Sequence, residues 1–168
     1  VEPVTDTVLT EVSKNPVTMP LAEKKQLLDE YNDIIWRTPR IQTSVINYGD
    51  SHKKAILLNS SGSYIEQEQT GITLRLTAIA TEGSEVQQAG LSLGSKGDFS
   101  SIQGIHQQVA QLAQRAVELL TAPQVKGGDY IVVLDPILAG VFVHEAFGHL
   151  SEADFVYEND RLRQIMTL

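Results

Sequence analysis

The sequence predicts an α+β fold: an antiparallel β-sheet meander with flanking helices, followed by the beginning of a second, catalytic domain. Between residues 41 and 93, apolar side chains alternate with polar ones, which is the pattern of half-buried β-strands. On both sides of this region, apolar residues instead recur at helical spacing. The chain has 168 residues, of which 42% are hydrophobic, and this is enough to bury one sizeable core, or one domain and part of another.

The first predicted helix begins after Pro20 and ends near Thr38. Thr18 offers a hydroxyl cap, and Pro20 is well tolerated close to the first helical turn. One apolar stripe runs along the helix and consists of Leu21, Leu27, Leu28, Tyr31, Ile34 and Ile35. Tyr31 and Trp36 are expected in the core or in contact with another domain, and contact with a partner subunit is the alternative.

Five short runs with a period of two predict the strands of the sheet. They cover residues 41–47, 55–58, 64–68, 72–78 and 86–93. Turn-forming residues separate these runs, notably at Tyr48-Gly49-Asp50, at Asn59 to Gly62 and at Glu82-Gly83-Ser84. Because the connections between successive strands are short, the strands are expected to run antiparallel as a meander.

The second predicted helix follows a loop from Gly94 to Asp98, which we interpret as a flexible connection and not as a phosphate-binding loop. Its apolar stripe consists of Ile105, Val109, Leu112, Ala116, Leu119 and Leu120. Residues 1–122 are therefore expected to form an α+β middle domain, and residues 123–129 a linker. Residues 130–168 are expected to be the truncated start of a carboxy-terminal domain, which opens with a buried strand from Tyr130 to Leu134.

Composition and charge exclude several classes of function. The net charge is −8 and no segment concentrates Lys and Arg, so nucleic acid is not an expected partner. No apolar run approaches the roughly 20 residues that cross a bilayer, and the first residues lack a signal peptide, so a cytoplasmic protein without membrane contact is expected. Cysteine is absent, which excludes disulfides and thiolate ligands within this sequence. Since the sequence lacks an initiating Met, we expect a piece of a longer protein.

The segment His144-Glu145-Ala146-Phe147-Gly148-His149 carries the residue types of a zinc peptidase. Such an enzyme needs neutral imidazoles as zinc ligands, an open coordination position for water, and a nearby carboxylate that takes the proton of that water. Both kinds of side chain are present within this segment. It therefore becomes the candidate zinc-binding motif of the chain.

The two histidines of the motif are five positions apart, whereas the common helical zinc motif places them four apart. On a regular α-helix, five positions correspond to about 140° around the axis, so the two imidazoles could not reach the same ion. A π-type turn, which closes between residues i and i+5, would bring them together, and Gly148 could ease that distortion. The spacing therefore predicts a π-bulge or a break between His144 and His149.

The histidines and the acidic residues near the motif also have structural interpretations. Two histidines on an ordinary helix could be capped or core residues, but a histidine pair would be costly on an apolar helix that follows a buried strand. His52 and His106 are interpreted as surface residues and not as ligands. Glu152 and Asp154 either orient an imidazole or form a solvated acidic turn.

The motif, together with Glu152, Asp154 and Phe155, resembles the signature of the TldD/PmbA family of metallopeptidases. The resemblance is clearest from Leu138 to Phe155, and the preceding strands and helix are similar to the middle region of that family in order and length. It favours the TldD branch, because the PmbA/TldE branch typically lacks the motif.

This resemblance implies roles for three residues of the motif. His144 and His149 are expected to bind Zn²⁺, and Glu145 is expected to be the general base. The third zinc ligand in the TldD branch is a cysteine far downstream, so the site is expected to be incomplete within this sequence. The resemblance further implies a cytoplasmic enzyme that acts on peptides and pairs with a PmbA/TldE-like subunit or with a second copy of itself as a dimer.

Three functional hypotheses follow from the sequence. The leading one is a zinc-dependent peptidase that hydrolyses unfolded or short peptides bound in an extended form along a sheet edge, with its site completed by a downstream domain. The alternative is a noncatalytic subunit or scaffold domain of a peptidase-like complex, in which the histidines pack structurally. A third hypothesis is a metal-dependent hydrolase that acts on a nonpeptide amide. The substrate sequence and the choice between exopeptidase and endopeptidase action stay open.

Overall fold

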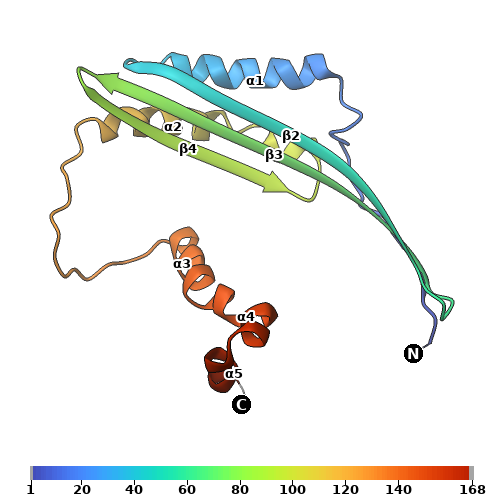
Figure 1. Cartoon of the computed structure of the whole chain (residues 1–168). Helices are drawn as coiled ribbons and strands as arrows, with labels where there is room; N and C mark the ends of the chain where they lie inside the picture. Colours follow the sequence, from blue (N-terminus) through green and yellow to red (C-terminus); the bar gives the residue numbers. More distant parts are fainter. Residues whose placement is uncertain (1, 167–168) are drawn as a thin grey trace. The chain divides into compact units, whose positions relative to one another are not determined.

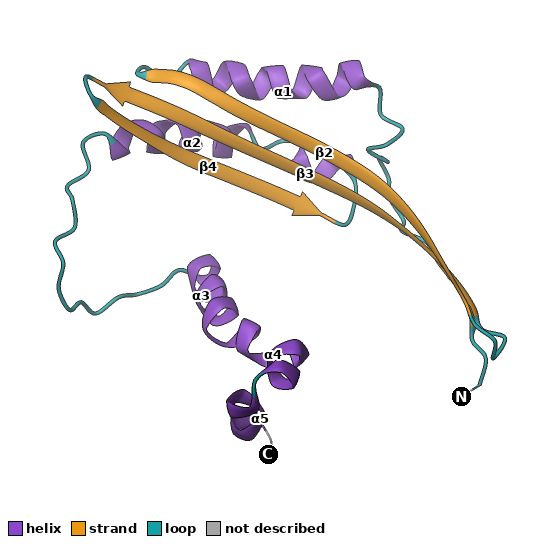
Figure 2. Ribbon diagram, viewed as in Figure 1, coloured by secondary structure: helices purple, strands orange, loops and turns teal. Residues whose placement is uncertain are grey.

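A computed structural model describes residues 2–166 of the chain. It divides into two compact units, Val1–Pro123 and Gln124–Leu168. The first unit contains a β-sheet with two long helices, and the second consists of short helical segments (Figures 1 and 2). The division into a middle domain, a linker and a second domain stays a prediction about the full-length protein. Residues 167 and 168, the last two of the predicted second domain, lie outside the described residues.

The sheet has four strands: β1 (Thr5–Val8), β2 (Ile41–Leu58), β3 (Tyr64–Glu82) and β4 (Glu85–Ser95). The central strand is β3, which pairs antiparallel with β2 along almost its whole length and with β4 over its second half. The predicted α+β fold with an antiparallel meander is therefore confirmed. The short strand β1 pairs parallel with β3, from Thr5 opposite Tyr64 to Val8 opposite Gln67, so the sheet as a whole is mixed.

The turn predicted at Tyr48-Gly49-Asp50 is wrong, because β2 continues through these residues without interruption. Gly49 lies opposite Thr73 of β3, and a Cβ at position 49 would lie 3.1 Å from the Thr73 hydroxyl oxygen. The glycine thus allows a close approach of the Thr73 side chain and does not mark a turn. The two other predicted turns are confirmed, since Gly62 and Gly83 have positive φ angles of 91° and 62° between the strands.

The core lies between one face of the sheet and the helices α1 (Leu21–Trp36) and α2 (His106–Leu119), which confirm the two predicted helices. Every second residue of β3 is buried on that face: Ile72, Leu74, Leu76, Ala78 and Ala80. The helices complete the core with Tyr31, Ile35, Val109, Leu112, Ala113 and Ala116. Burial of each large side chain in this set contributes about 1.5–3 kcal/mol. The period-two pattern of β3 and the helical patterns of α1 and α2 mark the two sides of this one apolar core.

The aromatic residues of α1 have different environments. Tyr31 is fully buried, and its hydroxyl donates a hydrogen bond to the Ile102 carbonyl at 2.7 Å, which confirms its predicted place in the core. Trp36 is 50% exposed and donates from Nε1 to the Ser44 hydroxyl at 2.8 Å, so a core position is wrong for this residue. The predicted hydroxyl cap is also wrong, because Thr18 donates to the Asn15 carbonyl and caps no amide of α1.

The second unit consists of α3 (Pro136–Val143), η2 (His144–Gly148), η3 (His149–Ser151), α4 (Ala153–Glu158) and α5 (Asp160–Met166). The buried strand predicted from Tyr130 to Leu134 is wrong, because these residues are irregular and exposed. A strand needs a neighbour for its backbone hydrogen bonds, and the described residues of this unit form no other strand. None of the helices in residues 2–166 combines the length and apolar character needed to cross a membrane.

The loop between β4 and α2, predicted to be a flexible connection, is held by hydrogen bonds to the side chain of Asp98. One carboxylate oxygen accepts hydrogen bonds from the amides of Ser13 and Lys14, at 2.9 and 3.1 Å, and from the Ser13 hydroxyl. The other accepts from the amide of Ser100, at 2.7 Å, and from its hydroxyl, and so caps the short helix η1 (Phe99–Ile102). The hydroxyls of Ser100 and Ser13, with the neighbouring amides, hold the pKa of Asp98 well below its usual range.

Substitution of Asp98 by Asn is expected to lower the stability of the chain at neutral pH and to flatten its dependence on acid. The folded-state pKa of Asp98 is depressed, so its contribution is fully present above the unfolded value of about 3.9 and is lost as the pH falls toward the folded value. Urea unfolding midpoints of the wild type and the variant should therefore converge between pH 5 and pH 2. A constant difference over that range would contradict this role.

Candidate metal centre

Helix α3 leads into the candidate motif and has a well-defined start. The Asp135 carboxylate accepts hydrogen bonds from the amides of Ile137 and Leu138, at 2.8 and 3.1 Å, and Pro136 occupies the first turn. A capped start followed by a proline fixes where the helix begins and therefore the rotation of every later residue about its axis. The sequence signal for this helix start is Asp135-Pro136, a capping aspartate followed by a proline, and the sequence-based prediction missed it.

The motif leaves the α-helical geometry at His144. Residues His144–Gly148 form the π-helical turn η2, and the backbone amide of His149 donates to the carbonyl of His144. This hydrogen bond joins residues i and i+5, which is the closure that the spacing of the histidines requires. The predicted π-type distortion between His144 and His149 is thus confirmed.

The π-turn brings three potential metal ligands together. The imidazoles of His144 and His149 have ring centroids 4.5 Å apart and lie edge to face. One ligand atom from each of His144, Glu145 and His149 lies within 4.8 Å of the others, and no other group of this kind was found among residues 2–166. A tetrahedral ion with bonds of about 2 Å holds its ligand atoms roughly 3–3.5 Å apart, so small side-chain rotations are enough to reach a binding geometry.

The donor atoms of this cluster suit zinc. Two neutral imidazoles and a carboxylate are the ligands that Zn²⁺ uses most often besides thiolates. Glu145 is mostly exposed, and its carboxylate lies 3.7 Å from Nε2 of His149. It can therefore reach a water beside the two imidazoles. The residues present therefore fit a metal ion with the ligand preferences of Zn²⁺.

Glu152 approaches His149 from the other side of the ring. Its carboxylate oxygen lies 2.8 Å from Nδ1 of His149, within hydrogen-bonding distance. Of the two interpretations of Glu152 left open by the sequence, the geometry favours the carboxylate that orients an imidazole. Asp154 lies in the first turn of α4. The side chain of Phe155, which belongs to the resemblance, lies outside the described part of the structure.

Gly148 has an ordinary helical backbone, with φ −57° and ψ −52°, so its conformational freedom is not what the π-turn needs. A Cβ at this position would lie 3.5 Å from Nδ1 of His144, in ordinary van der Waals contact. The idea that Gly148 eases the distortion of the backbone is therefore not supported. What the glycine provides is space beside the imidazole of His144.

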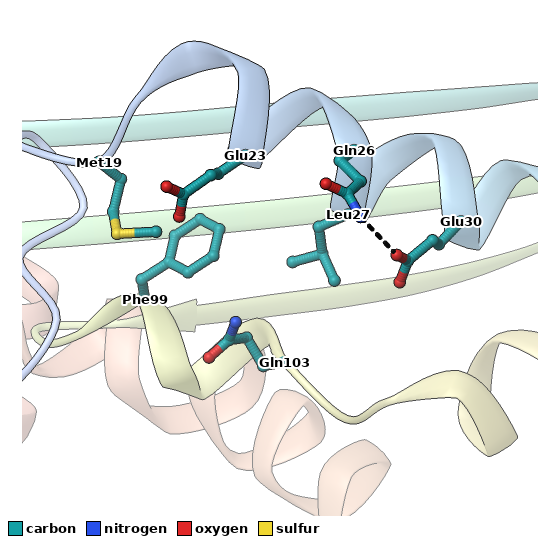
Figure 3. Close-up of a pocket in the computed structure, with 7 residues that line it drawn as sticks. All are labelled: Met19, Glu23, Gln26, Leu27, Glu30, Phe99 and Gln103. Carbon is teal, nitrogen blue, oxygen red and sulfur yellow. Dashed lines mark hydrogen bonds between the residues drawn. The ribbon is translucent and has the colours of Figure 1, made fainter.

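The two histidines outside the motif lie on the surface of the first unit, as predicted. His52 is exposed on β2, and His106 packs edge to face on Tyr31 and lies 3.7 Å from the Glu30 carboxylate. Figure 3 shows residues that line a pocket in the same unit, among them Leu27 of α1 and Phe99 of η1. The pocket has a volume of about 200 Å³. Its lining includes Glu23 and Glu30 but no histidine, and no group of three potential metal ligands lies there among residues 2–166.

A helical motif of two histidines and a glutamate, with ligand atoms within 4.8 Å of one another, is the class of site found in metallopeptidases. The profile of the PmbA/TldA metallopeptidase central domain matches residues 14–121. That match covers α1, α2 and the strands β2 to β4 of the first unit, but not β1. The chain belongs to the PmbA/TldD family of metallopeptidases.

Known relatives carry the similarity beyond the central domain. A metalloprotease of Synechocystis is 42% identical over 170 residues, which cover 100% of this chain and 37% of the relative. A metalloprotease of Methanothermobacter thermautotrophicus is 33% identical over 95% of this chain and 36% of its own length. A protein of Saccharolobus solfataricus named zinc metalloprotease TldD homolog is 32% identical over 69% of this chain and 26% of its own length. The matched part of the chain thus spans between 26% and 37% of the length of these relatives.

Two substitutions at Gly148 test whether space beside His144 matters for metal binding. Gly148→Ala should leave the zinc affinity of the full-length protein unchanged, because its Cβ makes only ordinary contacts. Gly148→Val should weaken zinc binding, because its two methyl groups extend from that Cβ toward the imidazole and restrict χ1. Competition with a chelator of known zinc affinity measures both effects. Equal affinities for the two variants would contradict the spatial role of Gly148.

Proposed function

We propose that this chain carries the zinc-binding and proton-transfer residues of a zinc-dependent peptidase that hydrolyses unfolded or short peptides. The observation that carries the proposal is the π-turn at His144–Gly148, which directs two imidazoles and the Glu145 carboxylate to one place. A structural pair of histidines would need no such departure from the α-helix. The name of the Saccharolobus relative, a zinc metalloprotease, supports the choice of zinc.

Each side chain of the motif has a defined task in this reaction. His144 and His149 hold the ion, which when bound supplies Lewis acidity that polarises the peptide carbonyl. Glu145 accepts a proton from the attacking water as the new C–O bond forms. The same carboxyl then gives that proton to the amine nitrogen as the peptide C–N bond breaks. Glu145 is well placed because it follows a ligand directly and lies within 3.7 Å of His149 Nε2.

The site is completed by a part of the full-length protein that this chain does not contain. Catalytic zinc sites usually have three protein ligands, and the motif offers two imidazoles when Glu145 serves as the base. In the family branch that the chain resembles, the third ligand is a cysteine, and this sequence contains no cysteine. The chain covers 37% of the Synechocystis relative, which leaves ample sequence for that ligand.

The remaining features of the proposal come from the family resemblance. The protein acts in the cytoplasm, as a dimer with a PmbA/TldE-like subunit or with a second copy of itself. Its substrate lies extended along a sheet edge, where backbone hydrogen bonds select it more than side chains do. The outer edges of β2 and β4 are unpaired among the described residues and offer this kind of contact.

Elemental analysis of the purified full-length protein tests the metal site. About one zinc per chain is expected for the wild type, and His149→Ala should lose most of it, because the His144 imidazole and the downstream ligand alone hold the ion weakly. His52→Ala is the matched control, since it removes an exposed histidine of the first unit. Absence of zinc after metal supplementation, or full zinc content in His149→Ala, would favour the noncatalytic scaffold.

Substitution of Glu145 by Gln separates metal binding from catalysis. The variant should keep its zinc and lose roughly 10²- to 10⁴-fold in peptide hydrolysis, because an amide cannot accept the proton of water. Glu158→Gln makes the same change of charge in α4 and should retain activity. Hydrolysis of an unstructured peptide by zinc-loaded protein is the measurement. Full hydrolysis by Glu145→Gln would show that Glu145 is not the general base.

A further inference from the structure

We propose that Glu152 is a positioning residue for the zinc site: it fixes the tautomer of His149, so that Nε2 of this ring is the nitrogen that faces the metal. This inference rests on the proposed function, since it assigns a task to Glu152 only if His149 is a ligand. It concerns a residue outside the six-residue motif. The argument depends on how the two nitrogens of His149 are placed.

The two nitrogens of the His149 ring face different carboxylates. Nδ1 lies 2.8 Å from a carboxylate oxygen of Glu152, which is hydrogen-bonding distance. Nε2 lies 3.7 Å from a carboxylate oxygen of Glu145, which is one of the three residues of the ligand cluster. The ring therefore lies between the Glu152 carboxylate, on the side of Nδ1, and the Glu145 carboxylate, on the side of Nε2.

The chemistry of a neutral imidazole then determines where its proton lies. Such a ring has one N–H donor and one nitrogen with a free lone pair, whereas an ionised carboxylate only accepts hydrogen bonds. The short contact with Glu152 requires the N–H on Nδ1, because a lone pair there would face an acceptor. Nε2 is left with the lone pair that a metal ligand needs.

The backbone holds Glu152 in place for this contact. The Glu152 amide donates to the His149 carbonyl at 3.3 Å, where the short helix η3 ends, and the residue itself turns to an extended conformation with ψ 138°. The Ser151 hydroxyl donates to the Gly148 carbonyl at 2.8 Å and closes the same turn. Glu152 is thus attached to His149 through both its main chain and its side chain.

Stability alone does not explain this pair. The side chains of His149 and Glu152 are 45% and 47% exposed, and ion pairs at such positions contribute little to folding, about 0–1 kcal/mol. A carboxylate behind a metal-bound imidazole has a larger effect on metal affinity, roughly 10- to 100-fold.

The test measures zinc affinity of the full-length protein by competition with a chromophoric chelator. Glu152→Ala should weaken zinc binding roughly 10- to 100-fold. Glu152→Gln should cause a smaller loss, because its amide oxygen still accepts from Nδ1–H but carries no charge. Glu158→Ala and Glu158→Gln are the matched controls, since Glu158 is exposed, lies in the adjacent helix and forms no ion pair among residues 2–166. Both controls should bind zinc like the wild type.

Hydrolysis at saturating zinc provides the second measurement. Glu152→Ala should recover most of the wild-type kcat once its site is filled, because the base Glu145 is intact. Zinc affinities equal to those of the Glu158 controls would overturn the proposal while leaving the zinc peptidase unaffected. Unchanged affinity with a lost kcat would also overturn it, because Glu152 would then act in the reaction itself. A wild type that binds no zinc would instead refute the proposed function on which the inference rests.

Discussion

The candidate site depends on one backbone hydrogen bond, from the amide of His149 to the carbonyl of His144. It closes the helix over five residues, and this closure brings to one side two imidazoles that an α-helix would separate by about 140°. Single π-turns are uncommon and are found mostly at functional sites, because the regular α-helix is otherwise preferred. The position of Glu145 before the second ligand follows from this turn, whereas Glu152 reaches the same imidazole from the end of the helix.

The two units of the chain contrast in how they are stabilised. The first has an apolar core beneath β3, with Leu74 and Val109 fully buried, and it corresponds to the central domain of the family. The second exposes the apolar side chains of its helices, such as Ile137 at 82% and Phe147 at 65%. Helices that are apolar all round are normally covered by other parts of a protein. An uncovered helix and a site with two imidazole ligands both fit our proposal that another part of the full-length protein completes the site.

Sequence patterns predicted the elements that have a strong periodic signal or a simple geometric constraint. The helices α1 and α2 follow from their apolar stripes, and the π-turn follows from the spacing of His144 and His149. Strand β1 was missed because all four of its residues are exposed, so no alternation marks it. Gly49 was taken for a turn because sequence cannot distinguish a glycine that bends the chain from one that makes room for Thr73. The contact of Glu152 with His149 depends on the end of the helix, which the sequence left open.

The most direct test of this account is a crystal structure of the zinc-loaded full-length protein, with the metal located by anomalous scattering at the zinc edge. We expect a single zinc bound by Nε2 of His149 and by the imidazole of His144, at about 2.0–2.1 Å, with the π-turn intact. A zinc ion bound elsewhere, or a regular α-helix from His144 to His149 with only one of them on the metal, would contradict it.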